Sequence, residues 1–202
     1  MKPRLIIEQK ITAFTNIYRV FGVAETGEKA SLVALAQQKR IAFKEKVSFY
    51  NDELKTRLTF TLRAEKVLDV HGRYIVEDEN GQIVGMFKKE FKNSLLNSTW
   101  KIMDADGNEL YTVKESNMTL AIIRRFAGWL PYIGDLVEII ILFFRYHFVF
   151  TDVKTGEPIG KYQKTTLFRD HYTLSTTDEA FSRVDWRVLA AMGVGLDALQ
   201  SR

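Results

Sequence analysis

Residues 74–87 read YIVEDENGQIVGMF, two short apolar runs joined by the polar segment Asp78-Glu79-Asn80-Gly81. β-Branched and aromatic residues are frequent in both runs, which is typical of strands. Gly81 supplies the positive φ that a tight hairpin turn requires. We therefore expect a β-hairpin over these residues.

The same module of strand, Asp-containing turn, Gly and strand occurs twice more in the chain. It covers residues 100–113 and residues 148–162. Gly85 and Gly160 follow two of the turns at the same spacing, and an interior strand glycine often marks a bend or bulge. The repetition predicts a meander of hairpins, and closure into a barrel would remove its exposed edges.

Strands are also expected before the first of these modules. Leu58, Phe60 and Leu62 alternate with polar residues, which is the pattern of a half-buried strand. Residues 31–38 are rich in Ala, Leu and Gln, a composition that favours a helix on propensity alone. Because residues 41–50 look like strand again, we expect a strand at 31–38 as well.

The C-terminal tail has a different pattern, because residues 188–196 contain no charged or polar side chain. A helix that is apolar on all sides is buried on all sides. As a helix, residues 186–199 would be about 21 Å long, against about 30 Å of hydrocarbon in a bilayer. We expect a central helix over 185–200; the lumen of a narrow barrel and a groove on the surface both fit these residues.

Composition limits the class of protein. The chain has 202 residues, 46% hydrophobic and 27% charged, which suits one globular domain. The lack of cysteine excludes a disulfide framework, a thiolate zinc site and a Cys nucleophile.

The net charge of +4 is small and no basic stripe is concentrated in the sequence, so we expect no nucleic-acid partner. The N-terminus lacks the apolar run of about 7–15 residues of a signal peptide, and we expect a cytoplasmic protein.

The order of these motifs resembles the LURP-one-related family, within the tubby C-terminal-like superfamily that also holds phospholipid scramblases. The resemblance implies a closed antiparallel barrel of about twelve strands around a central hydrophobic C-terminal helix, as a single domain over residues 1–202. It covers most of residues 15–200. The matching stretches are residues 38–43, 74–81 and 100–107, the turn at Gly156, the strand at 170–172 and the tail at 188–197.

The same resemblance implies a role at membranes. Tubby domains bind phosphoinositides through basic surface residues, and scramblases act at membranes. We therefore expect a non-catalytic binding module that associates with anionic phospholipid, peripherally on the inner membrane surface. The absence of cysteine leaves scramblase-type palmitoyl anchoring without support.

Residues 118–144 depart from the family pattern, and we expect a helical insertion at 117–141. Asp135 and Glu138 disfavour a transmembrane helix there, because each charge near the centre of a span costs about 2.5–3.5 kcal/mol. Two interpretations stay open. The segment lies in the membrane interface as a helical hairpin, or it forms short helices that cap the barrel or contact a protein partner or a second copy. The residues expected at the membrane or partner are Trp129, Tyr132 and Leu136, with Arg124 and Arg125 facing anionic lipid.

A second candidate for headgroup binding is a set of lysines in the predicted strands. Alternation places Lys88, Glu90 and Lys92 on one face of a strand. The interleaved Glu90 equally favours an ordinary solvated face. The candidate headgroup residues are Lys88, Lys89, Lys92, Lys161 and Lys164.

Neither a metal site nor an active site is expected. Residues 104–108 and Glu115 resemble a calcium loop in spacing, but Glu109 occupies the position that such a loop reserves for Gly. Predicted strands rather than helices flank the segment, so a hairpin turn is the better interpretation. The three histidines are scattered, and the chain has no glycine-rich phosphate loop. We therefore expect no enzyme activity and no cofactor.

Overall fold

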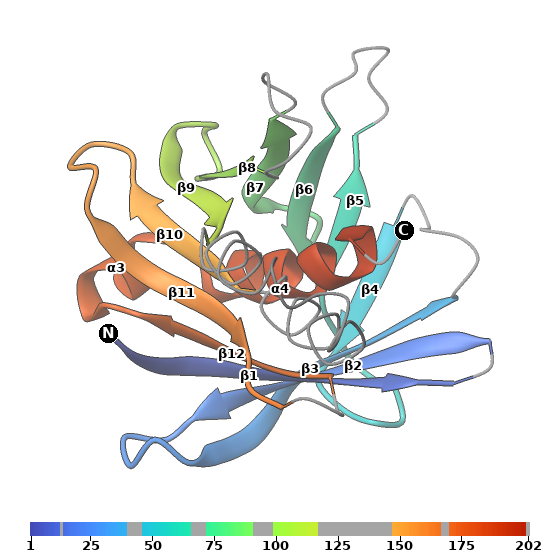
Figure 1. Ribbon diagram of the computed structural model, residues 1–202. Helices are drawn as coiled ribbons and strands as arrows, with labels where there is room; N and C mark the ends of the chain where they lie inside the picture. Colours follow the sequence, from blue (N-terminus) through green and yellow to red (C-terminus); the bar gives the residue numbers. More distant parts are fainter. Residues whose placement is uncertain are drawn as a thin grey trace, which may run out of the picture.

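Each strand pairs with its neighbours in the sequence, and β1 closes the ring by pairing with β12 (Figure 1). In this computed structural model, the described residues are 1–12, 14–39, 46–65, 72–90, 99–116, 147–166 and 170–200. They form twelve strands, all paired antiparallel, and two helices. The expected closed antiparallel barrel with a C-terminal helix is therefore confirmed.

The elements follow one another as a simple meander, as the repeated hairpins predicted. The strands are β1 (Lys2–Ile11), β2 (Thr15–Val23), β3 (Lys29–Lys39), β4 (Lys46–Tyr50), β5 (Leu58–Ala64), β6 (Arg73–Asp78), β7 (Ile83–Glu90), β8 (Thr99–Met103), β9 (Glu109–Glu115), β10 (Phe148–Asp152), β11 (Pro158–Lys164) and β12 (Asp170–Thr176), and the helices are α3 (Asp178–Arg183) and α4 (Trp186–Gln200).

The local predictions from the sequence are confirmed. The three repeated modules form the hairpins β6–β7, β8–β9 and β10–β11, and their turn residues Gly81, Gly107 and Gly156 have φ of 81°, 88° and 73°. The strand register shifts next to both Gly85 and Gly160, so each of these glycines marks a bulge. Residues 31–38 lie within β3, because pairing with β2 overrides their helix propensity.

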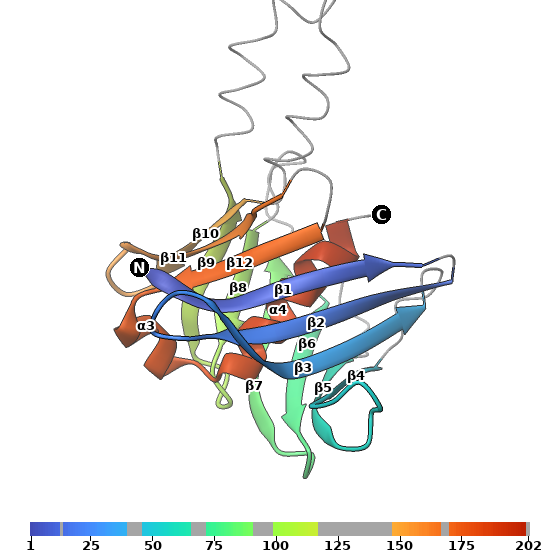
Figure 2. The ribbon, with the colours of Figure 1, turned by 90° about the horizontal axis from the view of Figure 1, so that it is seen from below.

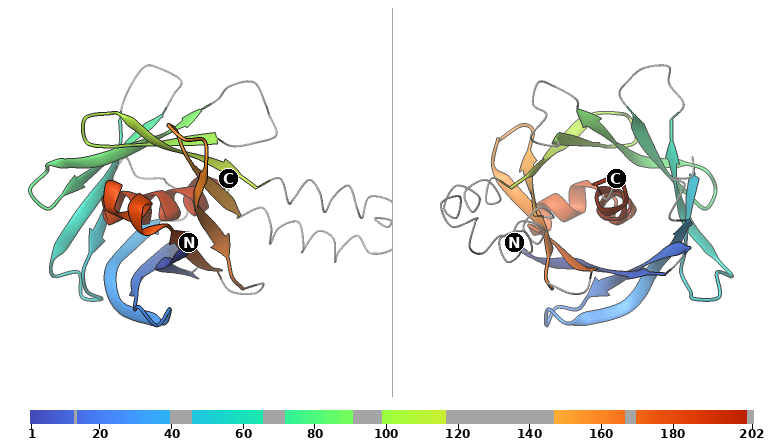
Figure 3. Two further views of the ribbon diagram at one scale, coloured as in Figure 1. Left: turned by 90° about the vertical axis from the view of Figure 1, so that its left-hand side faces the viewer. Right: turned by 45° about the vertical axis from the view of Figure 1, so that its right-hand side comes forward.

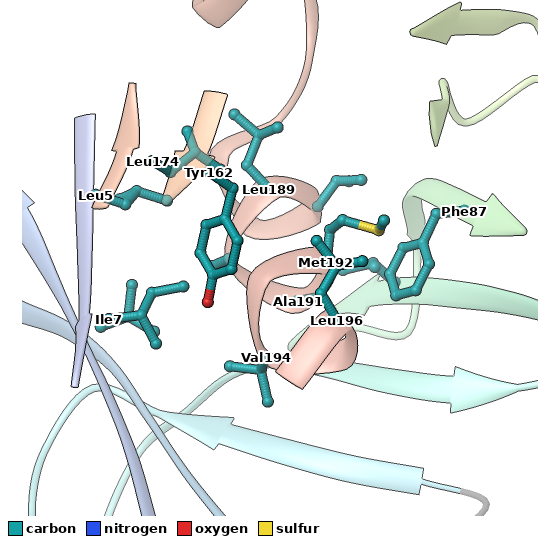
Figure 4. Packing of buried hydrophobic residues seen from close by; sticks show 14 of the residues in the cluster. Leu5, Ile7, Phe87, Tyr162, Leu174, Leu189, Ala191, Met192, Val194 and Leu196 are labelled. Atoms are coloured by element: carbon teal, nitrogen blue, oxygen red, sulfur yellow. The ribbon is translucent and has the colours of Figure 1, made fainter. Parts of the chain in front are cut away.

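Helix α4 runs through the lumen of the barrel, which decides between the two placements that the sequence allowed. All of residues 188–192 are at most 1% exposed, as expected for a helix with apolar side chains on every face. Figure 3 shows the strands surrounding α4 on all sides. In Figure 4, Met192 and Leu196 lie toward Phe87 on one side of the helix, while Leu5, Ile7 and Tyr162 lie on the other.

The two ends of the barrel differ. At one end, which we call the α3 rim, lie the turns that follow β2, β4, β6, β8 and β10, together with α3 (Figure 2). The other end, the far rim, is formed by the last residues of β1, β3, β5, β7, β9 and β11.

Short polar contacts hold α3 against the α3 rim. Thr177 caps the helix by accepting a hydrogen bond from the Ala180 amide. Asp178 forms ion pairs with Lys2 and Arg4 of β1, and Arg183 donates to the buried Asp152 at 2.6 Å. These contacts join the first strand, the β10–β11 turn and the C-terminal region.

The segment predicted as an insertion lies between β9 and β10 in the sequence. Residues 117–146 lie outside the described residues, and with them the predicted helical insertion at 117–141. Within the part of the chain that the structure describes, no helix has the length and apolar character needed to cross a membrane.

Candidate functional site

The outer face of β7–β9 carries a network of alternating charges. Lys88 pairs with Glu109 at 3.0 Å, and Lys101 contacts the same carboxylate at 2.7 Å. Lys101 also lies 4.0 Å from Glu90. Hydrogen bonds from Lys101 and Lys88 lower the pKa of Glu109. The charge of the predicted headgroup residue Lys88 is therefore balanced within the barrel wall.

Two other predicted headgroup residues do not belong to the outer face. The ammonium group of Lys89 lies 5.6 Å from the centre of the Trp100 ring, and Trp100 belongs to the core. Lys164 follows the inward-facing Tyr162 by two residues and pairs with Asp170 at 2.7 Å. The predicted lysines therefore do not form one patch.

Lys161 of β11 does lie on the outer face, and a second lysine lies near it. Val149 of β10 pairs with Lys161 on one side and with Lys114 of β9 on the other. Both lysines are exposed, and neither has a carboxylate within 4 Å among the described residues. We call Lys114 and Lys161 the outer basic pair.

The outer basic pair lies beside a buried histidine. His147 directly precedes β10 and is 7% exposed, and its Nε2 is 3.3 Å from the carbonyl oxygen of Lys164. Burial lowers the pKa of His147; the nearby charge of Lys161 acts in the same direction, while the contact with the Lys164 carbonyl partly opposes it. The imidazole next to the pair is therefore held in its neutral form near pH 7.

Sequence reasoning missed Lys114, although the signal was present. Tyr111 and Val113 are buried, so alternation along β9 sends Thr112 and Lys114 to the outer face. The remaining predicted contacts, Lys92, Arg124, Arg125, Trp129, Tyr132 and Leu136, lie outside the described residues and stay predictions.

The turn that resembles a calcium loop is a hairpin turn. The Asp104 carboxylate accepts hydrogen bonds from the main-chain amides of Asp106 and Asn108 and from the side chain of Asn108. The Asn108 side chain, followed by these amides, lowers the pKa of Asp104. Over the described residues, no group of His, Asp and Glu side chains is arranged to hold a metal ion.

The fold defines a class of protein: a closed antiparallel barrel with an apolar helix through its lumen. The chain matches the LURP-one-related family over residues 33–197, from within β3 to the C-terminal part of α4, and it belongs to that family. No curated protein and no solved structure shows a significant match to it.

Proposed function

We propose that this protein is a non-catalytic binding module that associates with anionic phospholipid at a membrane surface through the outer basic pair. The observation that carries the proposal is the exposure of Lys114 and Lys161 without a neighbouring carboxylate among the described residues. By contrast, Lys88 and Lys101 in the neighbouring part of the wall both pair with Glu109, and Glu90 lies 4.0 Å from Lys101.

The spacing of the pair suits a surface of phosphate groups. Two strand separations place the backbones of β9 and β11 about 10 Å apart. That distance is about one screening length at 0.1 M salt, so both charges act on the same patch of lipid. Each basic residue near an anionic leaflet contributes about 1 kcal/mol. Two lysines alone give weak binding, so stable association needs a further contribution.

The predicted contacts of residues 118–144 would supply that contribution. This segment joins β9 to β10, the strands on which Lys114 and Val149 lie. Arg124 and Arg125 would add cations, and Trp129, Tyr132 and Leu136 would add apolar area at the interface. The resemblance to tubby domains, which bind phosphoinositides, and to scramblases, which act at membranes, supports the same assignment.

Vesicle flotation tests the proposal. The substitutions Lys114→Glu and Lys161→Glu together should reduce flotation with phosphatidylserine-containing vesicles to the level seen with neutral phosphatidylcholine. The matched control is Arg57→Glu with Lys154→Glu, which makes the same charge change at exposed positions of the α3 rim. Flotation of the control should match that of the wild type. Equal loss in both variants would show a dependence on net charge alone and contradict the proposed site.

A deletion of residues 119–138 separates the two contributions. If the segment contacts lipid, the deletion should lower flotation further than the lysine substitutions do. If the wild type does not float with anionic vesicles, the alternative of a soluble interaction module takes the place of the lipid proposal. Its test is a change of Trp129 and Leu136 to Ser, with the oligomeric state measured by sedimentation velocity.

A further inference from the structure

The barrel wall opens between β3 and β4. The register of these two strands includes only Leu35 with Tyr50 and Ala36 with Phe49. Beyond Ala36, β3 continues to pair with β2 as far as Lys39, while β4 pairs with β5 from Lys46 onward. The two strands therefore diverge toward the far rim, and a pocket of about 280 Å³ lies between them. We call it the seam pocket.

The lining of the seam pocket is polar and cationic. Lys46 and Lys55 line it together with Gln37, Gln38, Ser48 and Tyr50, and no carboxylate belongs to the described lining. Along β3, Ala36 is buried on the inner side, so Gln38 also points inward while Gln37 points outward. The pocket therefore passes from the outer surface of the wall toward the lumen.

The inner end of the pocket holds an amide with unused hydrogen-bonding capacity. Gln38 is 5% exposed, and its side chain makes no hydrogen bond to the described residues. Asn16, its partner across the β2–β3 pair, has a buried Oδ1 that also has no hydrogen-bond partner among them. Buried polar groups are almost always bonded, so the unbonded Asn16 Oδ1, next to the Gln38 amide that lines the pocket, indicates a site for a polar ligand.

Lys55 is held toward the pocket by an unusual backbone conformation. Its φ of 59° is the one positive value among the described non-glycine residues. The Asp52 carboxylate fixes this turn by accepting bonds from the Thr56 amide, at 3.1 Å, and the Thr56 hydroxyl, at 2.8 Å. The Lys55 ammonium group donates to Gln37 across the pocket. A strained residue in a ligand-facing position is a feature of binding sites.

Glu53 acts electrostatically on Lys55, but its carboxylate is bonded to Arg19. Glu53 accepts two hydrogen bonds from Arg19, at 2.6 Å and 3.1 Å. Lys46 forms no ion pair with any described residue. The pocket thus contains two ammonium groups, and no described carboxylate in its lining offsets them.

We propose that the seam pocket binds a small anion, the carboxylate or phosphate group of a low-molecular-weight compound. Lys46 and Lys55 take the anionic group, and the Gln38 amide at the inner end bonds a polar substituent. The volume lies near the lower limit of ordinary ligand pockets, about 300 Å³, which favours a small ligand over a peptide. This site is separate from the outer basic pair, and its failure would leave the proposed function untouched.

Amide NMR titrations with inorganic phosphate and with acetate, at an ionic strength kept constant with chloride, test the proposal. We expect saturable shifts at residues 37, 38 and 46–48 with at least one of the two anions, and the comparison identifies the preferred group. Lys46→Ala with Lys55→Gly should weaken binding at least tenfold, because each lost charge-assisted bond weakens binding substantially. Glycine accepts the φ of residue 55, so the fold should persist. Lys154→Ala is the control and should bind as the wild type does.

Two further measurements complete the test. Gln38→Leu should also weaken binding while leaving the pattern of amide signals elsewhere unchanged. The double variant Lys46→Ala/Lys55→Gly should float with phosphatidylserine-containing vesicles to the same extent as the wild type. Unchanged flotation would show that the pocket binds a small ligand and not a lipid headgroup. The proposal would be overturned if the amide shifts did not saturate, or if chloride caused equal shifts. It would also be overturned if the Lys46→Ala/Lys55→Gly variant bound the anion as the wild type does, or if this variant no longer floated with vesicles.

Discussion

Gly85 of β7 lies so close to Val188 of α4 that a Cβ atom at position 85 would sit 2.7 Å from Val188 Cγ2. The same atom would lie 3.0 Å from the main-chain oxygen of Met103. Gly85 also has a φ of 155°, which side chains rarely adopt. Barrel wall and helix therefore meet here without room for a methyl group, and the bulge at Gly85 creates that fit.

Gly85→Ala should destabilise the fold by about 2–5 kcal/mol, the sum of overpacking and backbone strain. Gly81→Ala is the matched control. Its φ of 81° is also positive, but nothing lies within 4 Å of a Cβ placed there. The control should lose about 1 kcal/mol, from the backbone alone. Urea denaturation measures both values. Equal losses of stability in the two variants would show that the close contact with Val188 does not add to the cost of Gly85→Ala.

Removal of residues 186–202 should abolish cooperative folding. Helix α4 fills the lumen, and without it inward residues such as Phe87 and Tyr162 would face an empty interior. Near-ultraviolet circular dichroism and thermal melting would show the loss of fixed packing. The single substitution Leu196→Ala is a less severe change. It should lower the free energy of unfolding by about 2–5 kcal/mol, because Leu196 is 1% exposed. A truncated chain that melts cooperatively would contradict the central placement of α4.

The ion pairs of Asp178 should make the fold sensitive to acid. Hydrogen bonds from Lys2 and Arg4 lower the pKa of Asp178 from 3.8 to about 2. The native state therefore holds this proton less tightly than the unfolded chain, and the contribution to stability is present above pH 3.8 and is lost as the pH falls toward 2. Asp178→Asn should flatten the dependence of Tm on pH in this range.

The control for this measurement is Asp106→Asn, which changes an exposed carboxylate in the β8–β9 turn. Its Tm should fall between about pH 4 and pH 2 as steeply as that of the wild type. An Asp178→Asn curve as steep as the wild-type curve would mean that the contacts of α3 with β1 contribute nothing to acid sensitivity.

Local features of the fold could be predicted from the sequence, because their causes lie in adjacent residues. The turns at Gly81, Gly107 and Gly156 depend on one backbone conformation each, and the burial of α4 follows from its apolar faces. The position of α4 in the lumen was not decided by residues 185–200, because a groove would bury the same side chains. The family resemblance pointed to the lumen.

The candidate sites were harder to predict, because they depend on which residues face each other across strands. Lys88 and Lys164 looked like free cations in the sequence. Glu109 and Asp170 neutralise them, and these partners are known only once the register of the strands is known. The seam pocket has the same origin, since it exists only because β3 and β4 stop pairing after Ala36.

The buried His147 should make stability depend on pH between about 5 and 7. Burial lowers its pKa below 6.5, so the unfolded chain takes up the proton more readily than the native state, and stability falls as the pH falls through this range. His147→Gln removes that group, so the difference in unfolding free energy between about pH 7 and pH 5 should be smaller than in the wild type. Urea denaturation at both pH values measures it. The control is His171→Gln, the same change at a less buried position, which should keep the wild-type difference in unfolding free energy between the two pH values. A His147→Gln variant that also keeps this difference would show that His147 is not protonated on unfolding in this range.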